Sequence, residues 1–199
     1  MSSSGQLVQR KSLPPSLTPI VPVLAMAALM WALEIVDAIP GVNLDQYGIQ
    51  PRDGEGLAGI VAAPFLHGSF AHLIANTGAF LVLGALIAWT THRFVAVTLG
   101  VALIGGLGTW LFGGALTIHI GASGLVYGYA AFLLAWGVLA RRLLSIAVAL
   151  VVAIMYGSIV WGVLPGQPGI SWQGHLFGAL GGVLMAWWLS RREPSRQPA

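Results

Sequence analysis

Apolar residues run along this chain in six stretches, each about as long as one membrane crossing. Short polar connections separate them, and they lie near residues 19–39, 70–90, 94–116, 121–140, 143–164 and 175–190. A helix needs roughly 20 apolar residues to cross the hydrocarbon part of a bilayer. Because lipid offers no hydrogen bonds to an open backbone, the pattern predicts an all-α, polytopic membrane protein of six transmembrane helices.

The segments outside these stretches are polar or mixed. Residues 1–17 and 191–199 predict two tails, the first of them flexible. Residues 40–66 combine glycine and apolar side chains with charged ones, and a loop of this length is usually functional or partly structured. We therefore expect a long, partly structured first loop. Residues 25–27 resemble a signal-peptide cleavage site, but the apolar run continues past them, which favours an uncleaved first span.

Composition agrees with a membrane protein and excludes several other classes. Hydrophobic side chains make up 57% of the chain and charged ones only 8%, against about 25% in soluble domains. A soluble enzyme, a disordered protein and a nucleic-acid binder are all excluded on this ground. The chain has no cysteine, so disulfides and thiol chemistry are excluded too. Its expected surroundings are the lipid bilayer.

The few basic residues predict the orientation of the spans. Six spans bring both termini to one side, and eight of the nine Lys and Arg residues then fall on that side. They are Arg10, Lys11, Arg93, Arg141, Arg142, Arg191, Arg192 and Arg196. Arg52 alone falls on the other side. Cytoplasmic loops are enriched in Lys and Arg, so we expect both termini to be cytoplasmic.

Four polar residues interrupt the apolar spans. They are His72 and Asn76 in the second span, Ser123 in the fourth and His175 in the sixth. Polar and ionisable residues inside a membrane are costly and commonly functional. All three spans run from outside to inside in the predicted topology, and the four residues lie near their starts. They therefore share one depth, in the outer half of the membrane.

Ser123 and His175 have a pattern of small residues around them that favours close approach. Small residues let membrane helices pack tightly, and glycines recur every fourth residue at Gly124, Gly128, Gly174, Gly178 and Gly182. If these faces meet, Ser123 becomes a nucleophile beside a general base. The alternatives are that Ser123 serves helix packing alone and that His175 is solvated at the interface.

Three further residues occupy positions from which they can support Ser123 and His175. Tyr127 follows Ser123 by one helical turn, where it can stack on His175. His72 and Asn76 are four residues apart and share a face, so both can donate hydrogen bonds to a developing oxyanion. Packing for Tyr127, and hydrogen bonds between helices for His72 and Asn76, are the alternatives.

The blocks that contain these residues resemble the rhomboid intramembrane serine proteases. Residues 67–76 match the family pattern H-x4-H-x3-N, residues 121–127 match GxSG followed by tyrosine, and residues 174–182 match H-x2-G-x3-G. Residues 47–52 also resemble the first loop of bacterial members. Any one block is weak, but three in the right order, on the right spans and at one depth, are strong together.

The resemblance implies a role for each position. Ser123 is the expected nucleophile and His175 its general base, without an aspartate to complete a triad. The backbone N–H of Ser123 forms the oxyanion hole together with His72 and Asn76, and Tyr127 stacks under His175. Gly121, Gly124, Gly178 and Gly182 support these groups, and the resemblance implies neither a metal nor an organic cofactor.

The function expected from this resemblance is an intramembrane serine endopeptidase. Its substrates would be single-span membrane proteins, its location the bacterial plasma membrane, and its active site would face outward. Nothing in the sequence fixes the oligomeric state. The alternatives are a catalytically inactive rhomboid-like protein that binds membrane helices, a small transporter or channel, and a metal site made of His67, His72, His119 and His175.

Overall fold

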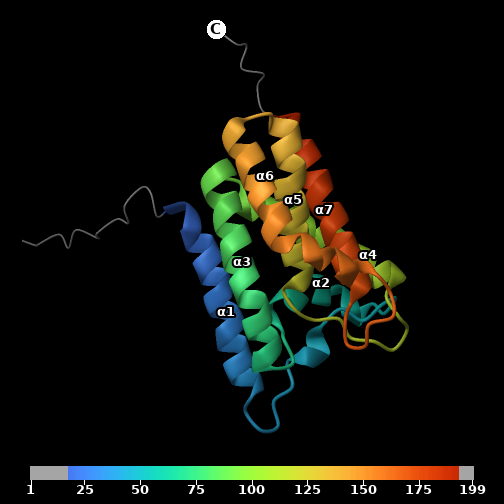
Figure 1. Ribbon diagram of the computed structural model, residues 1–199. Helices are drawn as coiled ribbons and strands as arrows, with labels where there is room; N and C mark the ends of the chain where they lie inside the picture. Colours follow the sequence, from blue (N-terminus) through green and yellow to red (C-terminus); the bar gives the residue numbers. More distant parts are fainter. Residues whose placement is uncertain (1–17, 193–199) are drawn as a thin grey trace, which may run out of the picture.

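Six long helices and one short helix form a bundle in the computed structural model, which describes residues 18–192 (Figure 1). They are α1 (Val21–Asp37), the short α2 (Gly59–Ala62), α3 (Phe70–Thr91), α4 (Phe94–Phe112), α5 (Ser123–Ala140), α6 (Leu143–Tyr156) and α7 (Trp172–Ser190). Residues 18–192 contain no strand, only an isolated bridge between Ile49 and His119. The predicted all-α class is therefore confirmed.

Within residues 18–192, five helical segments are long and apolar enough to cross a membrane. They are Thr18–Asp37, Phe70–Thr91, Phe94–Phe112, Ser123–Ala140 and Leu143–Val163. The chain is an integral membrane protein. α7 is as long as α4, at 19 residues, but it is not among the five, because Gln173, His175 and its glycines make it less apolar. That α7 is the sixth span stays a prediction.

Two helices end before the spans expected from the sequence. α4 stops at Phe112 rather than near residue 116, because Gly113 adopts an extended backbone with ψ of 159°. α6 is a regular α-helix only as far as Tyr156. The remainder of that predicted span, Gly157–Val163, is a 3₁₀ helix, which matters because it borders the candidate site.

Two other helices begin where local backbone chemistry allows. α5 starts at Ser123 instead of residue 121, since Gly121 has φ of +108°, a conformation open to glycine and incompatible with a helix. α7 starts at Trp172, before the predicted residue 175. The Ser171 side chain accepts a hydrogen bond from the Gly174 N–H and caps the helix.

The long first loop is folded, as the sequence predicts. It contains the 3₁₀ helices Asp45–Tyr47, Glu55–Leu57 and Ala63–Phe65, with α2 between the last two. The Arg52 guanidinium ties the loop to the end of α4, donating to the carbonyls of Leu111 and Gly113 at 3.0 and 2.8 Å. These bonds hold the loop against α4, beside the start of α5.

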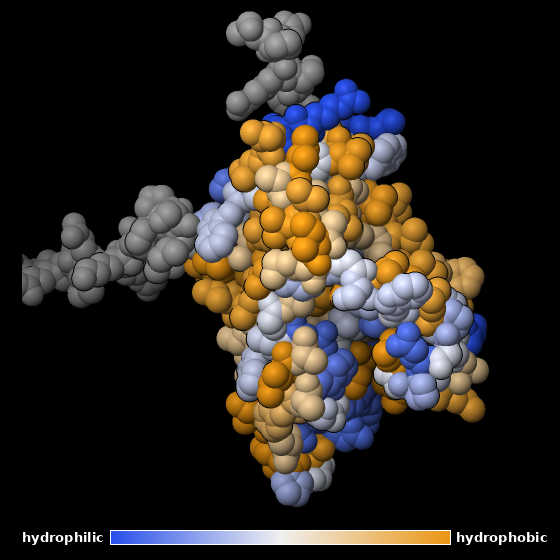
Figure 2. All heavy atoms as spheres, in the orientation of Figure 1, coloured by the Kyte–Doolittle hydropathy of each residue, from blue (hydrophilic) through white to orange (hydrophobic). Residues whose placement is uncertain are grey.

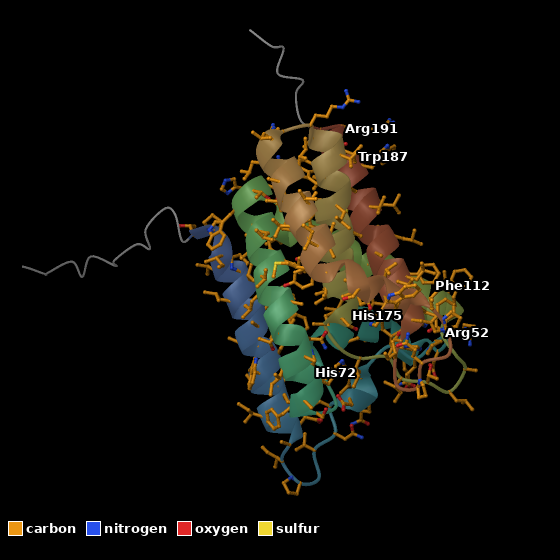
Figure 3. The ribbon with its side chains drawn as sticks, in the orientation of Figure 1. Arg52, His72, Phe112, His175, Trp187 and Arg191 are labelled. Carbon is orange, nitrogen blue, oxygen red and sulfur yellow. The ribbon has the colours of Figure 1, made fainter. Side chains whose placement is uncertain are left out.

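The molecule has a broad apolar band with polar groups at its ends (Figure 2). α1 begins and α7 ends toward the upper end of the view in Figure 1, and hydrophilic atoms gather at that end in Figure 2. Figure 3 labels Arg191 there and Arg52 toward the other end. The predicted tail 1–17 lies outside the described residues, as does the second tail beyond residue 192.

Candidate active site

Ser123 is the first residue of α5, and two hydrogen bonds fix the turn that precedes it. The Gly121 N–H donates to the carbonyl of Ala63 at 2.9 Å. The Ala122 N–H donates to Nε2 of His67 at 3.3 Å. Both acceptors come from the end of the first loop, so this loop positions the serine even though it is far away in sequence.

His175 lies opposite, on the second turn of α7, with its imidazole held at both nitrogens. Nδ1 lies 2.9 Å from the carbonyl oxygen of Gly162, and Nε2 lies 2.9 Å from Oγ of Ser123. A carbonyl only accepts hydrogen bonds, so Nδ1 carries the proton of the neutral ring. Nε2 is then free to accept, and the Ser123 hydroxyl donates to it.

The ring of Tyr127 covers one face of His175. The two ring centroids are 3.9 Å apart, and the planes differ by only 9°. His175 is 7% exposed. A side chain added at Gly162 would collide with the Tyr127 hydroxyl. The imidazole is therefore held by a ring below, a carbonyl at Nδ1 and a serine at Nε2.

Glycines bring α5 and α7 close enough for this contact. A Cβ at Gly178 would run into the carbonyl of Gly124, and one at Gly182 into the carbonyl of Gly128. α4 also packs closely against α7, since a Cβ at Gly105 of α4 would lie 3.2 Å from the Gly178 Cα. The glycine rows seen in the sequence thus meet one another, with α7 packed against both α4 and α5.

His72 and Asn76 face the turn that leads to Ser123. A Cβ built on Gly121 would lie 2.8 Å from Nε2 of His72 and 3.8 Å from Nδ2 of Asn76. His72 Nδ1 donates to the His67 carbonyl at 2.5 Å. Asn76 donates to the backbone oxygen of His72 at 3.1 Å, which uses one of its two N–H groups. Figure 3 shows His72 and His175 in the same half of the bundle.

The four polar residues border a single cavity of about 560 Å³. Its walls come from α3, α5, α7 and the two connections that precede α5 and α7. The lining residues are His72, Ala75, Asn76, Thr117, Ile118, His119, Ile120, Ser123, Gly169, Ile170, Ser171 and His175. The cavity is large enough for a stretch of polypeptide, and the polar side chains among its lining residues can bind water.

The hydrogen-bond partners of three supporting groups could not be identified from the sequence. The Gly162 carbonyl is a backbone group, and every residue has one. His67 and His119 are visible as histidines, but only the fold reveals their partners. His119 lies 2.6 Å by Nδ1 from Oγ of Ser171, the residue that caps α7.

His67 is almost completely buried, and it works as a neutral ring. It is 1% exposed, and its Nδ1 has no hydrogen-bond partner among the described residues. Burial, with a smaller contribution from nearby His72, lowers the pKa of His67 to about 4. Burial also lowers the pKa of His119. Neutral His67 is what the Ala122 N–H requires, because a protonated ring has no acceptor.

The histidines of the candidate site are not arranged as a metal site. No group of three His, Asp or Glu side chains within residues 18–192 is arranged to hold a metal ion. The four histidines of the metal-site alternative, His67, His72, His119 and His175, each have protein hydrogen-bond partners instead.

Comparison with known proteins gives consistent matches. A family model described as the Rhomboid domain matches residues 55–192. An uncharacterized protein of Mycobacterium tuberculosis is 45% identical over 180 residues, covering 86% of this chain and 75% of that relative. An uncharacterized protein of Mycobacterium leprae is 43% identical, and the match covers 87% of this chain and 72% of that relative's length. A Bacillus subtilis protein named "Putative rhomboid protease YdcA" is 26% identical, and the match covers 90% of this chain and 93% of that relative.

Proposed function

The chain belongs to the rhomboid family, a family of intramembrane proteases, and on this premise we propose that it is a serine endopeptidase acting within the membrane. Ser123 is the nucleophile, and His175 is the general base. The observation that carries the proposal is the 2.9 Å contact between Ser123 Oγ and His175 Nε2. It is supported by the carbonyl of Gly162, which fixes the tautomer that makes Nε2 the acceptor.

In the first step, Ser123 Oγ attacks the carbonyl carbon of a substrate peptide bond. His175 Nε2 takes the hydroxyl proton, so the ring becomes an imidazolium. A triad would hold this ring with a carboxylate, whereas here the Gly162 carbonyl accepts from Nδ1–H and Tyr127 stacks on the ring. No charged partner is needed to orient the base.

The oxyanion of the tetrahedral intermediate forms beside the turn that precedes Ser123. The Ser123 backbone N–H, the second N–H of Asn76 and the His72 ring are the proposed donors. Removing one such donor commonly costs about 10²–10³ in kcat. His72 Nδ1 contacts the His67 carbonyl, so Nε2 is the ring nitrogen that faces the turn at Gly121.

In the second half of the reaction, imidazolium His175 returns its proton to the leaving amine, and an acyl-enzyme on Ser123 remains. Water then attacks this ester, with His175 again acting as the base. The cavity beside the dyad supplies a route for that water, since Thr117, His119 and Ser171 line it.

The substrates we propose are single-span membrane proteins whose transmembrane segments unwind locally. A helical amide is shielded by its own hydrogen bonds, so the scissile bond has to leave the helix before Ser123 reaches it. We also propose a bacterial plasma membrane, with both termini in the cytoplasm and the site toward the external face. The 8:1 division of basic residues supports this orientation.

A cleavage assay with purified protein tests the proposal. The wild type in detergent is incubated with a generic single-span substrate, in parallel with Ser123→Ala, His175→Ala and the control Gly157→Ala. A side chain at Gly157 meets nothing within 4 Å, so this control keeps activity. We expect cleavage by the wild type and the control alone. Cleavage by Ser123→Ala, or loss of cleavage on adding a chelator, would contradict the mechanism.

A further inference from the structure

Two adjoining cavities run between α1 and α4, and we call them together the α1–α4 groove. One has a volume of about 430 Å³ and the other about 610 Å³. They share four lining residues, Pro22, Phe94, Val95 and Leu99. The two volumes are therefore parts of one continuous depression on the lipid-facing surface.

The smaller cavity is almost entirely apolar. Its walls come from α1, α4, the end of the first loop and the start of α5. Within residues 18–192, the only side-chain hydroxyl in its lining is that of Thr98. This hydroxyl already bonds to the Phe94 carbonyl at 2.8 Å and to the Tyr129 hydroxyl at 2.7 Å. A polar ligand would find no free partner there, whereas a hydrocarbon chain needs none.

The larger cavity opens at the turn between α3 and α4, where the lining becomes basic. His92 and Arg93 border it, and both are exposed. Among the residues that the structure describes, no acidic side chain lines either cavity. In the predicted topology this turn lies at the cytoplasmic surface, where anionic lipid headgroups attract basic side chains.

The length of the apolar cavity suits one acyl chain of a lipid. From Phe94 to Leu103, the α4 residues that line the apolar cavity, the helix rises about 14 Å. This is close to half of the roughly 30 Å hydrocarbon core, the depth of one leaflet.

We propose that the α1–α4 groove binds one anionic phospholipid from the leaflet at the Arg93 end. The phosphate lies at Arg93, where a guanidinium can donate two parallel hydrogen bonds, and one acyl chain occupies the apolar cavity. The far end of that chain reaches Ile60 and Pro64, which also line the small cavity that borders Gly121 and Ser123. The lipid thus braces the part of the first loop that holds the serine turn.

Native mass spectrometry of the full-length protein tests headgroup selection. The detergent-purified protein is given equal amounts of phosphatidylglycerol and phosphatidylcholine with identical chains. We expect about fivefold more phosphatidylglycerol adduct on the wild type, and equal adducts on Arg93→Gln. Arg141→Gln, another exposed arginine on the same predicted side, keeps the preference. A preference that survives in Arg93→Gln overturns the headgroup site.

A second pair of variants tests the position of the acyl chain. Ala25 lines the apolar cavity, and Ala28 is exposed on the same helix but lines neither cavity. Ala25→Phe fills the groove, so we expect both lipid adducts to fall, while Ala28→Phe retains them. Equal adducts on the two variants overturn the proposal. The proposal is also overturned if Ala25→Phe retains its lipid but captures substrate more weakly, because that result would assign the groove to a peptide helix.

These readouts measure binding and do not depend on the proposed protease activity. Arg93 is exposed, so Arg93→Gln tests headgroup selection even if Ala25→Phe disturbs the bundle. A lipid site that is found in an inactive protein would leave this inference standing and would refute only the proposed function.

Discussion

The reactivity proposed for Ser123 depends on three groups outside the dyad itself. The Gly162 carbonyl sets which nitrogen of His175 carries the proton, and Tyr127 sets the plane of the ring. His67 holds the N–H that precedes Ser123. A change in any of these groups alters the geometry of the dyad without removing either member of it.

The lack of a side chain at Gly162 gives the first prediction. A Cβ there would collide with the Tyr127 hydroxyl and lie 3.1 Å from His175 Nδ1. We expect Gly162→Ala to lower kcat at least tenfold in the cleavage assay with little change in thermal stability. The double variant Gly162→Ala/Tyr127→Phe removes the colliding hydroxyl and regains part of the activity. If Gly162→Ala behaves like Gly157→Ala, the ring is not held as described.

Burial of His67 gives a prediction about pH. Its pKa is about 4 in the folded protein and near 6.5 when unfolded, so between these values the unfolded state binds more protons. Stability therefore falls as the pH drops from about 6.5 to 4, by up to roughly 3 kcal/mol. Thermal melting across this range measures it.

The matched variant for this pH effect is His67→Gln. Its amide oxygen can still accept from the Ala122 N–H but does not titrate. We expect a shallower loss of melting temperature toward pH 4 than in the wild type. Equal slopes in the two proteins would mean that His67 does not account for the acid sensitivity.

At the scale of helices, the packing of α7 against α4 and α5 allows the dyad to form. The glycines at which these helices meet leave no room for even a methyl group. The same glycines, with the polar first turn, lower the hydropathy of α7. The features that bring His175 to Ser123 are thus also those that make α7 the least obvious of the predicted spans.

A methyl group between these helices therefore has a predictable effect. We expect Gly178→Ala to push α7 away from the Gly124 carbonyl and to destabilise the protein by about 1–3 kcal/mol, with loss of cleavage. Gly78→Ala on α3, where a Cβ meets nothing within 4 Å, is the control and keeps both properties. Melting temperature and cleavage are measured together. A neutral Gly178→Ala would refute close packing at this position.

The amino-acid sequence is most informative where chemistry repeats at helical spacing. The interval between His72 and Asn76, the interval between Ser123 and Tyr127, and the glycine rows all indicate shared helix faces. Helix ends are harder to predict. The change from α-helix to 3₁₀ helix after Tyr156, for example, does not alter the spacing of apolar residues in the sequence. The Gly162 carbonyl as partner of His175 and the Ala122 N–H as partner of His67 could not be predicted, since a backbone group and a long-range hydrogen bond leave no local pattern.

At the scale of the whole molecule, the distribution of charged residues predicts the orientation in the membrane. Arg191 and Arg192 lie over the rings of Trp187 and Trp188 at 4.3 and 3.9 Å, an arrangement suited to a membrane interface. Arg52 lies toward the other end (Figure 3). The polar residues of the candidate site lie in the half of the bundle away from Arg191.

This distribution predicts the result of a topology experiment. A reporter fused after Ala199 is expected to be cytoplasmic, and one inserted at Gly41, in the first loop, is expected to be external, because basic residues stay on the inner side. An external signal at Ala199, or the same side for both reporters, would contradict the orientation and the count of six spans.

The central claim is that His175 activates the hydroxyl of Ser123. Labelling with a fluorophosphonate, followed by mass spectrometry of the modified peptide, tests this claim without knowledge of a substrate. We expect the wild type to be labelled at Ser123, Ser123→Ala to remain unlabelled, and His175→Ala to be labelled at a small fraction of the wild-type rate. Equal labelling of the wild type and His175→Ala, or a label on another serine, would contradict the account.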